Sequence, residues 1–136
     1  MDKPHKKLDV WNLSMDFAGL IYRFTTNLPT DERFGLVSQM RRAAVSIPCN
    51  LAEGAARGSR KEFRHFLSIA RISLSELDTQ LDLCFRLEFL TRDAREELDG
   101  PLMRIDKMLY ALYELKGREI ACEAASKGRT NSIAIP

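Results

Sequence analysis

The sequence has few of the residues that metal sites, disulfide scaffolds and nucleophilic active sites require. Its 136 residues include three cysteines, Cys49, Cys84 and Cys122, and two histidines, His5 and His65. The cysteines are odd in number and show no C-x-x-C spacing, so neither a disulfide framework nor a zinc ribbon is predicted. Cys49 and Cys84 lie in helical, mostly apolar contexts, and we expect them to be small buried residues in a reducing cytosol.

Long apolar runs, alternating strands and phosphate-binding loops are also missing. No stretch approaches the ~20 apolar residues of a membrane span, and residues 1–10 are charged, unlike a signal peptide. Nothing alternates with a period of two over a useful length, which argues against strands. No Walker loop and no G-x-G-x-x-G motif is present, so nucleotide hydrolysis has no support. We expect a cytoplasmic protein that uses no cofactor.

The overall composition is that of an ordinary globular domain. Hydrophobic residues make up 45% of the chain and charged residues 29%, which suits a single domain with a real core. The net charge is only +2. Any binding to nucleic acid must therefore depend on where the charge lies, because the chain as a whole is not a polycation.

Apolar residues recur every three or four positions through most of the chain, which is typical of amphipathic helices. Short turns between long helices make neighbours antiparallel, so we predict an all-α, up-down-up-down antiparallel four-helix bundle. Residues 1–117 would form the bundle domain, and residues 118–136 a frayed helix end and a flexible C-terminal tail. The predicted helices run from an Asp9 N-cap to just before Pro29, from about Asp31 to Ala56 with Phe34 facing inward, from about Arg60 to Leu90 with Phe85 facing inward, and from a Thr91 cap to about Gly117.

Proline, glycine and serine give local signals within this plan. Pro48 should kink the second helix, and Pro101 should kink or interrupt the fourth, because proline lacks an amide donor and clashes with the preceding turn. Gly58 suits the left-handed position that follows a helix end. Ser59 and Glu62 have the spacing of a capping box that starts the third helix.

The same residues form long motifs that resemble a known family. From about residue 8 to 116, the chain is similar to bacterial four-helix-bundle proteins first noticed as reading frames in intervening sequences of 23S ribosomal RNA genes, also labelled S23-type ribosomal proteins. The motifs are Leu8-x-Val10-Trp11, Phe34-x-Leu36-x-x-Gln39-Met40-Arg41-Arg42-Ala43-Ala44, Ser46-Ile47-Pro48-x-Asn50-Leu51-Ala52-Glu53-Gly54 and Phe63-x-x-Phe66-Leu67-x-x-Ala70-x-x-Ser73-x-x-Glu76-Leu77.

The resemblance implies a homopentamer arranged as a toroid or barrel. It also implies a distant similarity to the accessory variability proteins of diversity-generating retroelements, which form basic pentameric barrels that bind nucleic acid and a reverse transcriptase. The biochemical role of the intervening-sequence branch is not established, since its name records where the genes lie. Cys49 departs from the family pattern, where a small polar residue is more usual.

A basic group surrounds the turn between the second and third predicted helices. Arg60, Arg64 and Arg71 advance by four and seven residues, which places them on one side of the third helix. Arginines at a helix N-terminus bind phosphate well, because backbone donors and the helix dipole add to their charge. A solvated face, or pairing with acids across a subunit interface, would give the same pattern. The candidate nucleic-acid-binding residues are Arg41, Arg42, Arg57, Arg60, Lys61, Arg64 and Arg71.

Acidic residues gather elsewhere in the chain. Residues 76–99 contain eight aspartates and glutamates against three arginines. One end or face of the bundle should therefore be acidic and the other basic. Either the acidic face pairs with the basic one between subunits, or it leaves the basic end free for a polyanion.

A polar group lies near the middle of the second and third helices. If these helices are antiparallel about Gly58, positions whose numbers sum to roughly 116–120 face each other. Partly buried polar side chains must be hydrogen-bonded. We favour a network that fixes register, within the bundle or at a subunit seam, over a ligand or catalytic carboxylate site. Its members are Gln39, Ser46, Asn50, Glu53, Ser73 and Glu76.

Two further features bear on metal binding and assembly. Glu62 and His65 form one Glu-x-x-His pair, whereas di-iron bundles use two with further glutamates, so no metal site is predicted. Several aromatic residues exceed what one inner stripe can hold. They either widen the core or form a subunit interface, and with the family resemblance we favour the interface. They are Trp11, Tyr22, Phe24, Tyr110 and Tyr113.

Together these features predict a non-enzymatic homo-oligomer, a pentamer by the resemblance, that binds RNA or DNA. It would contact phosphates with little base reading, so its affinity should fall steeply with salt. The alternative is a protein-interaction scaffold with no direct nucleic-acid binding. An enzyme would need Asn50, Glu53 and Glu76 to line an open pocket.

Overall fold

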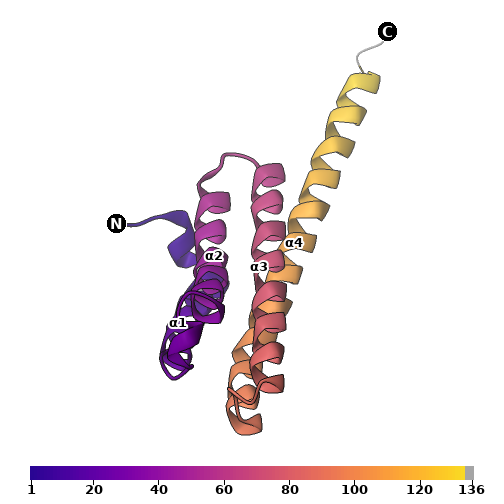
Figure 1. The fold of residues 1–136 in the computed structure, drawn as a ribbon. Helices are drawn as coiled ribbons and strands as arrows, with labels where there is room; N and C mark the ends of the chain where they lie inside the picture. The colour runs from indigo at the N-terminus through magenta and orange to yellow at the C-terminus, as the bar shows by residue number, and fades with distance from the viewer. Residues whose placement is uncertain (134–136) are drawn as a thin grey trace.

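The structure of the chain is a computed structural model, which describes the backbone of residues 1–133 and the side chains of residues 1–129. Every regular element among these residues is helical (Figure 1). In chain order, the elements are the 3₁₀-helix η1 (Pro4–Lys7), α1 (Asp9–Thr26), the 3₁₀-helix η2 (Thr30–Glu32), α2 (Leu36–Ala56), α3 (Arg60–Arg86) and α4 (Arg92–Ile133).

Consecutive helices pack side by side, and α4 returns to contact α1, which closes a bundle of four. In the described part of the chain, no contact joins α1 to α3 or α2 to α4. The α2–α3 and α3–α4 connections lie at opposite ends of the molecule (Figure 1). This arrangement confirms the up-down-up-down four-helix bundle that the sequence predicts.

The apolar stripes of the four helices meet in one core. Ile21 of α1, Met40 of α2, Leu77 of α3 and Leu109 of α4 are all fully enclosed. Burying one such side chain contributes roughly 1.5–3 kcal/mol. The helices are therefore held mainly by their shared apolar faces, since isolated helices of this kind are marginal in water.

The two cysteines expected in the core differ in their surroundings. Cys84 is fully buried, and its Sγ lies 3.7 Å from Sδ of Met40. Cys49 is exposed, so the prediction that it is buried was wrong. It follows the buried Pro48 on α2. Neighbouring side chains on a helix point about 100° apart, so the side chain of Cys49 is turned away from the core.

The register of α2 against α3 agrees with the prediction. The hydroxyls of Ser46 and Ser73, whose numbers sum to 119, lie 2.8 Å apart. Nearer the turn, a Cβ on Gly54 would come within 3.0 Å of Cβ of Phe66. The glycine therefore allows the two backbones to approach closely at this end of the pair.

The first long helix begins one residue earlier than predicted, and the second begins later. Leu8 is the N-cap of α1, so Asp9 is its first residue and not its cap, and no side chain caps this end. The predicted start of the second helix at Asp31 was wrong, because η2 and a turn precede Leu36. Phe34 lies in this turn and is 88% exposed, contrary to the inward position that we predicted for it.

The third helix ends four residues before its predicted end. After Arg86 the chain turns at Glu88, whose φ is 64°. The amide of Glu88 donates to the carbonyl of Phe85 at 3.1 Å, and the amide of Phe89 donates to the carbonyl of Cys84 at 2.9 Å. This pair of bonds is a Schellman motif. Phe85, the residue after the buried Cys84 in α3, is 41% exposed and not inward as predicted, because neighbouring side chains on a helix point about 100° apart.

The turn between α2 and α3 begins in an extended conformation. Arg57, the C-cap of α2, has φ −72° and ψ 149°. The left-handed conformation expected at Gly58 is not observed, and no glycine among residues 1–133 has a positive φ. Ser59 caps α3, because its Oγ accepts from the amide of Glu62 at 3.1 Å and its hydroxyl donates to the Glu62 carboxylate at 3.1 Å. Half of the predicted capping box is therefore present, because the carboxylate of Glu62 bonds to the hydroxyl of Ser59 and not to its backbone amide.

The last helix is longer and more continuous than predicted. α4 has 42 residues, or roughly 63 Å at 1.5 Å per residue. Its start is capped by Thr91, whose Oγ1 accepts from the amide of Ala94 at 3.2 Å. Pro101 does not interrupt it, because Leu98 and Leu102 on either side are both buried in the core.

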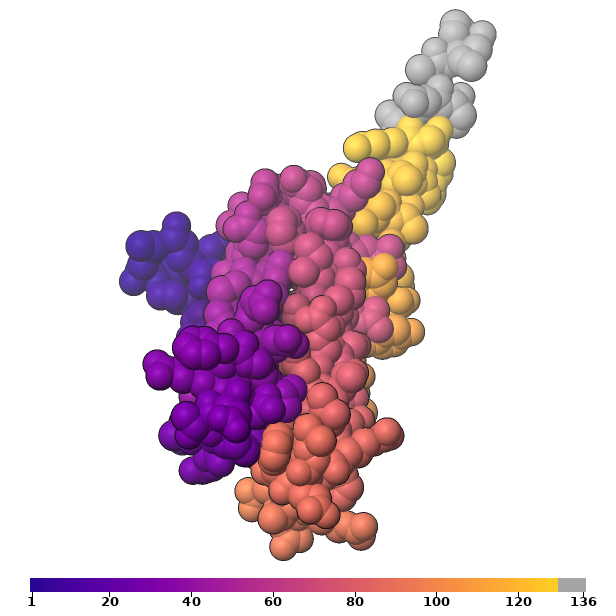
Figure 2. All heavy atoms as spheres, in the orientation of Figure 1, coloured from indigo at the N-terminus to yellow at the C-terminus, as the bar shows by residue number. Residues whose placement is uncertain are grey.

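The helix end and tail that the sequence places after Gly117 differ in the structure. Residues 118–133, here named the α4 extension, continue the helix, while residues 134–136 lie outside the described residues. The side chains of residues 121–129 are all exposed. Figures 1 and 2 show that the extension projects past the α2–α3 turn, clear of the bundle in this view.

Candidate nucleic-acid interface

The seven cations proposed from the sequence do not form one continuous surface. Arg41 lies near the start of α2 and Arg57 is its C-cap, so about four turns of helix separate them by roughly 24 Å. Arg60, Arg64 and Arg71 share one side of α3, as the spacing predicts, and this side faces α4. What each cation can bind therefore depends on its own neighbours.

Two of the α3 arginines are used to hold α3 against α4. Arg64 Nε donates to the carbonyl of Tyr113 at 3.2 Å, and its guanidinium lies 3.9 Å from the centre of the Tyr113 ring. The guanidinium of Arg71 lies 5.2 Å from the ring centre of Tyr110 and 5.3 Å from that of Tyr113. Stacking of this kind stabilises a helix contact. Neither guanidinium is presented freely to solvent.

The two cations near the start of α2 also differ from each other. Arg41 contacts α1, because its Nε donates to Oγ1 of Thr25 at 2.9 Å and its guanidinium lies 4.5 Å from the ring centre of Tyr22. Arg42 is exposed and has no ion pair among the described side chains. Arg41 therefore fastens α1 to α2, and only Arg42 is available to a ligand here.

The remaining cations gather where the α2–α3 turn meets α4. A hollow of about 410 Å³ separates the turn from α4, and its lining includes Arg57, Arg60, Lys116 and Glu123. Arg57 pairs with Glu53 at 2.7 Å but stays about half exposed. We name this region the basic end and define it by Arg57, Arg60, Lys61 and Lys116.

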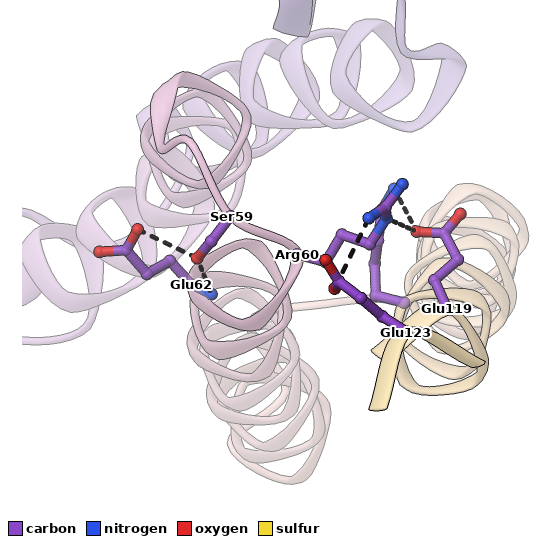
Figure 3. Close-up of polar contacts among 6 residues, drawn as sticks. Ser59, Arg60, Glu62, Glu119 and Glu123 are labelled. Atoms are coloured by element: carbon purple, nitrogen blue, oxygen red, sulfur yellow. Dashed lines mark hydrogen bonds and ion pairs between the residues drawn. The ribbon is translucent and has the colours of Figure 1, made fainter. Parts of the chain in front are cut away.

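Arg60, the first residue of α3, reaches across this hollow to α4 (Figure 3). Its Nε donates to Oε2 of Glu119 at 2.9 Å, and its Nη1 lies 3.7 Å from Oε2 of Glu123. Lys116 Nζ is 3.1 Å from the same Glu119 oxygen. The hydrogen bond from Lys116, aided by Arg60, lowers the pKa of Glu119 from its usual value. The carboxylate is therefore held between two cations.

Sequence reasoning missed Lys116, Glu119 and Glu123 at this site. A helix that ended at Gly117 would have left the two glutamates in a tail. A Cβ at Gly117 would come within 3.0 Å of Nη2 of Arg64, so this glycine makes room for a side chain that crosses α4. The i, i+4 spacing of Glu119 and Glu123 was the available signal that the helix continues with one acidic side.

The opposite end of the bundle is acidic, as the charge pattern predicts. Arg95 of α4 is paired there with Asp78 at 2.7 Å, Asp82 at 3.0 Å and Asp99 at 3.4 Å. Of the three arginines in residues 76–99, Arg95 is thus already paired with carboxylates, and the segment still has more carboxylates than arginines.

The predicted polar group is only partly assembled. Ser46 joins Ser73, and Nδ2 of Asn50 donates to Oγ of Ser46 at 2.9 Å and to its carbonyl at 2.8 Å. Glu53 turns away to Arg57. Gln39 and Glu76 are exposed on the walls of a shallow hollow of about 320 Å³, in which Ser46 and Ser73 also lie.

The polar residues do not converge as an enzymatic site would require. Asn50 and Glu53 are not part of the hollow that Glu76 lines. The Glu62 carboxylate is engaged with Ser59, and the exposed His65 ring packs edge-on against Phe66 at 5.4 Å. Over residues whose side chains are described, no group of three or more His, Cys, Asp and Glu is placed to hold a metal ion.

The comparisons with known proteins bear on this site. A family model described as the 23S rRNA-intervening sequence protein matches residues 6–111. The chain belongs to this family. It is also similar to the crystal structure of a protein of unknown function from the S23 ribosomal protein family of Bacteroides thetaiotaomicron, with 27% identity and a TM-score of 0.71 over 77% of this chain and 95% of that one.

No curated protein matches the chain, and the descriptions of the matched family and structure name no enzymatic activity. The family resemblance drawn from the sequence motifs is therefore confirmed. The family match ends at residue 111, so the α4 extension lies beyond it. None of the described helices has the length and apolar character needed to cross a membrane.

Proposed function

We propose that this member of the 23S rRNA-intervening sequence family is a non-enzymatic, self-assembling bundle that binds the phosphate backbone of RNA or DNA through its basic end. The observation that carries the proposal is the separation of charge along the bundle. Arg57, Arg60, Lys61 and Lys116 gather at the α2–α3 turn, while the excess carboxylates of residues 76–99 lie at the other end.

The chemistry of the basic end suits phosphate. Arg57 and Lys61 flank the start of α3, are exposed, and can contact phosphate oxygens without breaking a packed interior. The first turn of α3 adds the positive end of the helix dipole. No rigid set of side chains here is arranged to read base edges, so binding would depend on charge and fall steeply with salt.

Self-assembly would multiply this small site. Apolar side chains are exposed on two separate faces, with Met15 of α1 and Val45 of α2 on one, and Ile72 of α3 and Tyr110 of α4 on the other. The first face also contains an apolar hollow of about 500 Å³. Faces that differ in this way can pack head to tail and close a ring. A ring of basic ends would bind a polyanion with avidity.

The test is fluorescence anisotropy of the purified protein with a labelled structured RNA and a matched DNA duplex, at low and at physiological salt. We expect Arg57→Glu/Lys61→Glu to lose most of the binding. The matched control, Arg86→Glu/Arg92→Glu, reverses the same charge on exposed residues of the acidic end and should bind nearly as the natural protein does. Equal loss in both variants would contradict a site at the basic end.

A protein-interaction scaffold is the second candidate function, and one groove favours it. This groove of about 840 Å³ runs along α3, where Ile72 is 58% exposed and Leu83 44% exposed. Both apolar side chains line the groove, so a docked protein would bury them. Absence of nucleic-acid binding even at low salt would leave this function.

A further inference from the structure

The α4 extension is an addition to the part of the chain that the family model matches. The match ends at residue 111, and the helix continues to Ile133. The first acidic side chains of the extension are Glu119 and Glu123, and both meet the basic end. They are the only carboxylates that Arg60 contacts among the described side chains.

The position of Glu119 is that of an anionic ligand. One of its oxygens is 2.9 Å from Nε of Arg60 and 3.1 Å from Nζ of Lys116. Glu123 lies one turn further along α4 and borders the hollow between the α2–α3 turn and α4 (Figure 3). Carboxylate and phosphate oxygens bind arginine and lysine with the same geometry. A phosphate that used Arg60 and Lys116 would need the place that Glu119 now fills.

We propose that the α4 extension is an intramolecular competitor for nucleic acid, and that Glu119 and Glu123 occupy part of the phosphate-binding site until a polyanion displaces them. This inference rests on the proposed function. It divides the basic end into two pairs. Lys61, which is exposed, and Arg57, which stays half exposed beside Glu53, make the first contact, whereas Arg60 and Lys116 are released when Glu119 and Glu123 are displaced.

The contacts are of a strength that allows displacement. Arg60 is half exposed and Glu119 about one-third exposed, and ion pairs at such exposure are weak and screened by salt. A nucleic acid presents many phosphates and gains by releasing counterions, so it can outcompete two carboxylates. The side chains of residues 121–129 are exposed, so this part of the extension buries little apolar surface against the bundle. Its helix should therefore loosen when the carboxylates are displaced.

The test compares Glu119→Gln/Glu123→Gln with the matched control Glu96→Gln/Glu97→Gln, which removes the same charge from exposed residues of the acidic end. Binding to the labelled RNA is measured by anisotropy over a range of salt. We expect the first variant to bind roughly 3–10-fold tighter than the natural protein at low salt, because no carboxylate has to be displaced from Arg60 and Lys116 before they contact phosphates. The control should change affinity less than about twofold.

Amide hydrogen exchange supplies the second measurement. In the natural protein, exchange of residues 118–129 should speed up when saturating RNA is added, while α2 and α3 stay protected. Equal affinities of the two glutamine variants, or unchanged exchange in the extension, would overturn the competitor while leaving the proposed function standing. Absence of RNA binding by all three proteins at low salt would overturn both.

Discussion

Arg64 of α3 lies across Gly117 of α4, at the point where α4 leaves the bundle. A Cβ at position 117 would be 3.0 Å from Nη2 and 3.2 Å from Nε of the arginine. The same Nε donates to the carbonyl of Tyr113 at 3.2 Å. The glycine therefore has a packing role, and any side chain at 117 must displace the guanidinium or its hydrogen bond.

The first prediction concerns this pair. Alanine is favoured over glycine within a helix by about 1 kcal/mol. Gly117→Ala should therefore stabilise the protein by that amount only if the new Cβ does not meet the Arg64 guanidinium. In the Arg64→Ala background we expect the full gain. In the natural background the displaced arginine should cancel or reverse it. Urea unfolding of the four proteins in the cycle should give a coupling of about 1 kcal/mol, and equal effects in both backgrounds would contradict the contact.

A pair of helical glycines gives the second prediction. A Cβ on Gly54 would be 3.0 Å from Cβ of Phe66 and 3.4 Å from the carbonyl oxygen of Phe63, whereas nothing lies within 4 Å of a Cβ on Gly100. Gly54→Ala would push α2 and α3 apart, at a cost of roughly 1–3 kcal/mol for overpacking, and should destabilise the protein. Gly100→Ala should stabilise it by up to about 1 kcal/mol. Thermal unfolding checks the pair, and a stabilising Gly54→Ala would refute the close approach.

The sequence predicted the bundle because periodicity decides which residues share a helix face. It could not predict how far each helix is rotated about its axis. Arg60, Arg64 and Arg71 do share one side of α3, but that side faces the tyrosines and glutamates of α4. Whether a charged face is open or packed depends on contacts between residues that are about 50 positions apart, as with Arg64 and Tyr113.

The local signals failed where a tertiary contact opposed them. Gly117 indicated a helix end, but it lies inside α4 because Arg64 needs the space. Gly58 indicated a left-handed residue, but α2 ends in the extended conformation of Arg57, and it is α3 that ends with a left-handed residue, Glu88. The prediction that Ser59 caps α3 succeeded because its hydrogen bonds to Glu62 are made within one turn and need no distant partner.

The third prediction separates two residues that the sequence placed in one polar group. Asn50 donates two hydrogen bonds to Ser46, which is itself bonded to Ser73. Glu53 makes only an exposed ion pair with Arg57 among the described residues. Asn50→Ala should therefore cost about 1 kcal/mol, or roughly 3–6 °C in Tm, while Glu53→Ala should change the free energy of unfolding by less than about 0.5 kcal/mol. Calorimetry of both variants measures this, and equal losses would mean that Asn50 is not part of a network.

The fourth prediction uses the three free thiols. Cys49 and Cys122 are exposed, whereas Cys84 is enclosed in the core. A thiol reagent at neutral pH should label two cysteines rapidly and the third only as the protein unfolds, because the reactive thiolate is not formed in an apolar site. Serine variants of Cys49 and Cys122 identify the fast pair. Rapid labelling of all three thiols would contradict the packing of Cys84 beside Met40.

Cys84 should also make stability fall in alkaline solution. Burial raises its pKa to about 11, the carboxylate of Glu32 adds to this effect, and Arg95 opposes it. The unfolded thiol titrates near pH 8.5, so between about pH 8.5 and 11 the unfolded chain binds fewer protons than the folded one, and the free energy of unfolding falls as pH rises. This contribution is fully present below about pH 8.5. Cys84→Ala lacks the thiol, so its stability should decline less over this range, and the gap between the two proteins should narrow by up to about 1.4 kcal/mol per pH unit. If urea unfolding gave the same dependence of the free energy of unfolding on pH for the natural protein and for Cys84→Ala, the thiol would titrate alike in the folded and unfolded states, contrary to this prediction.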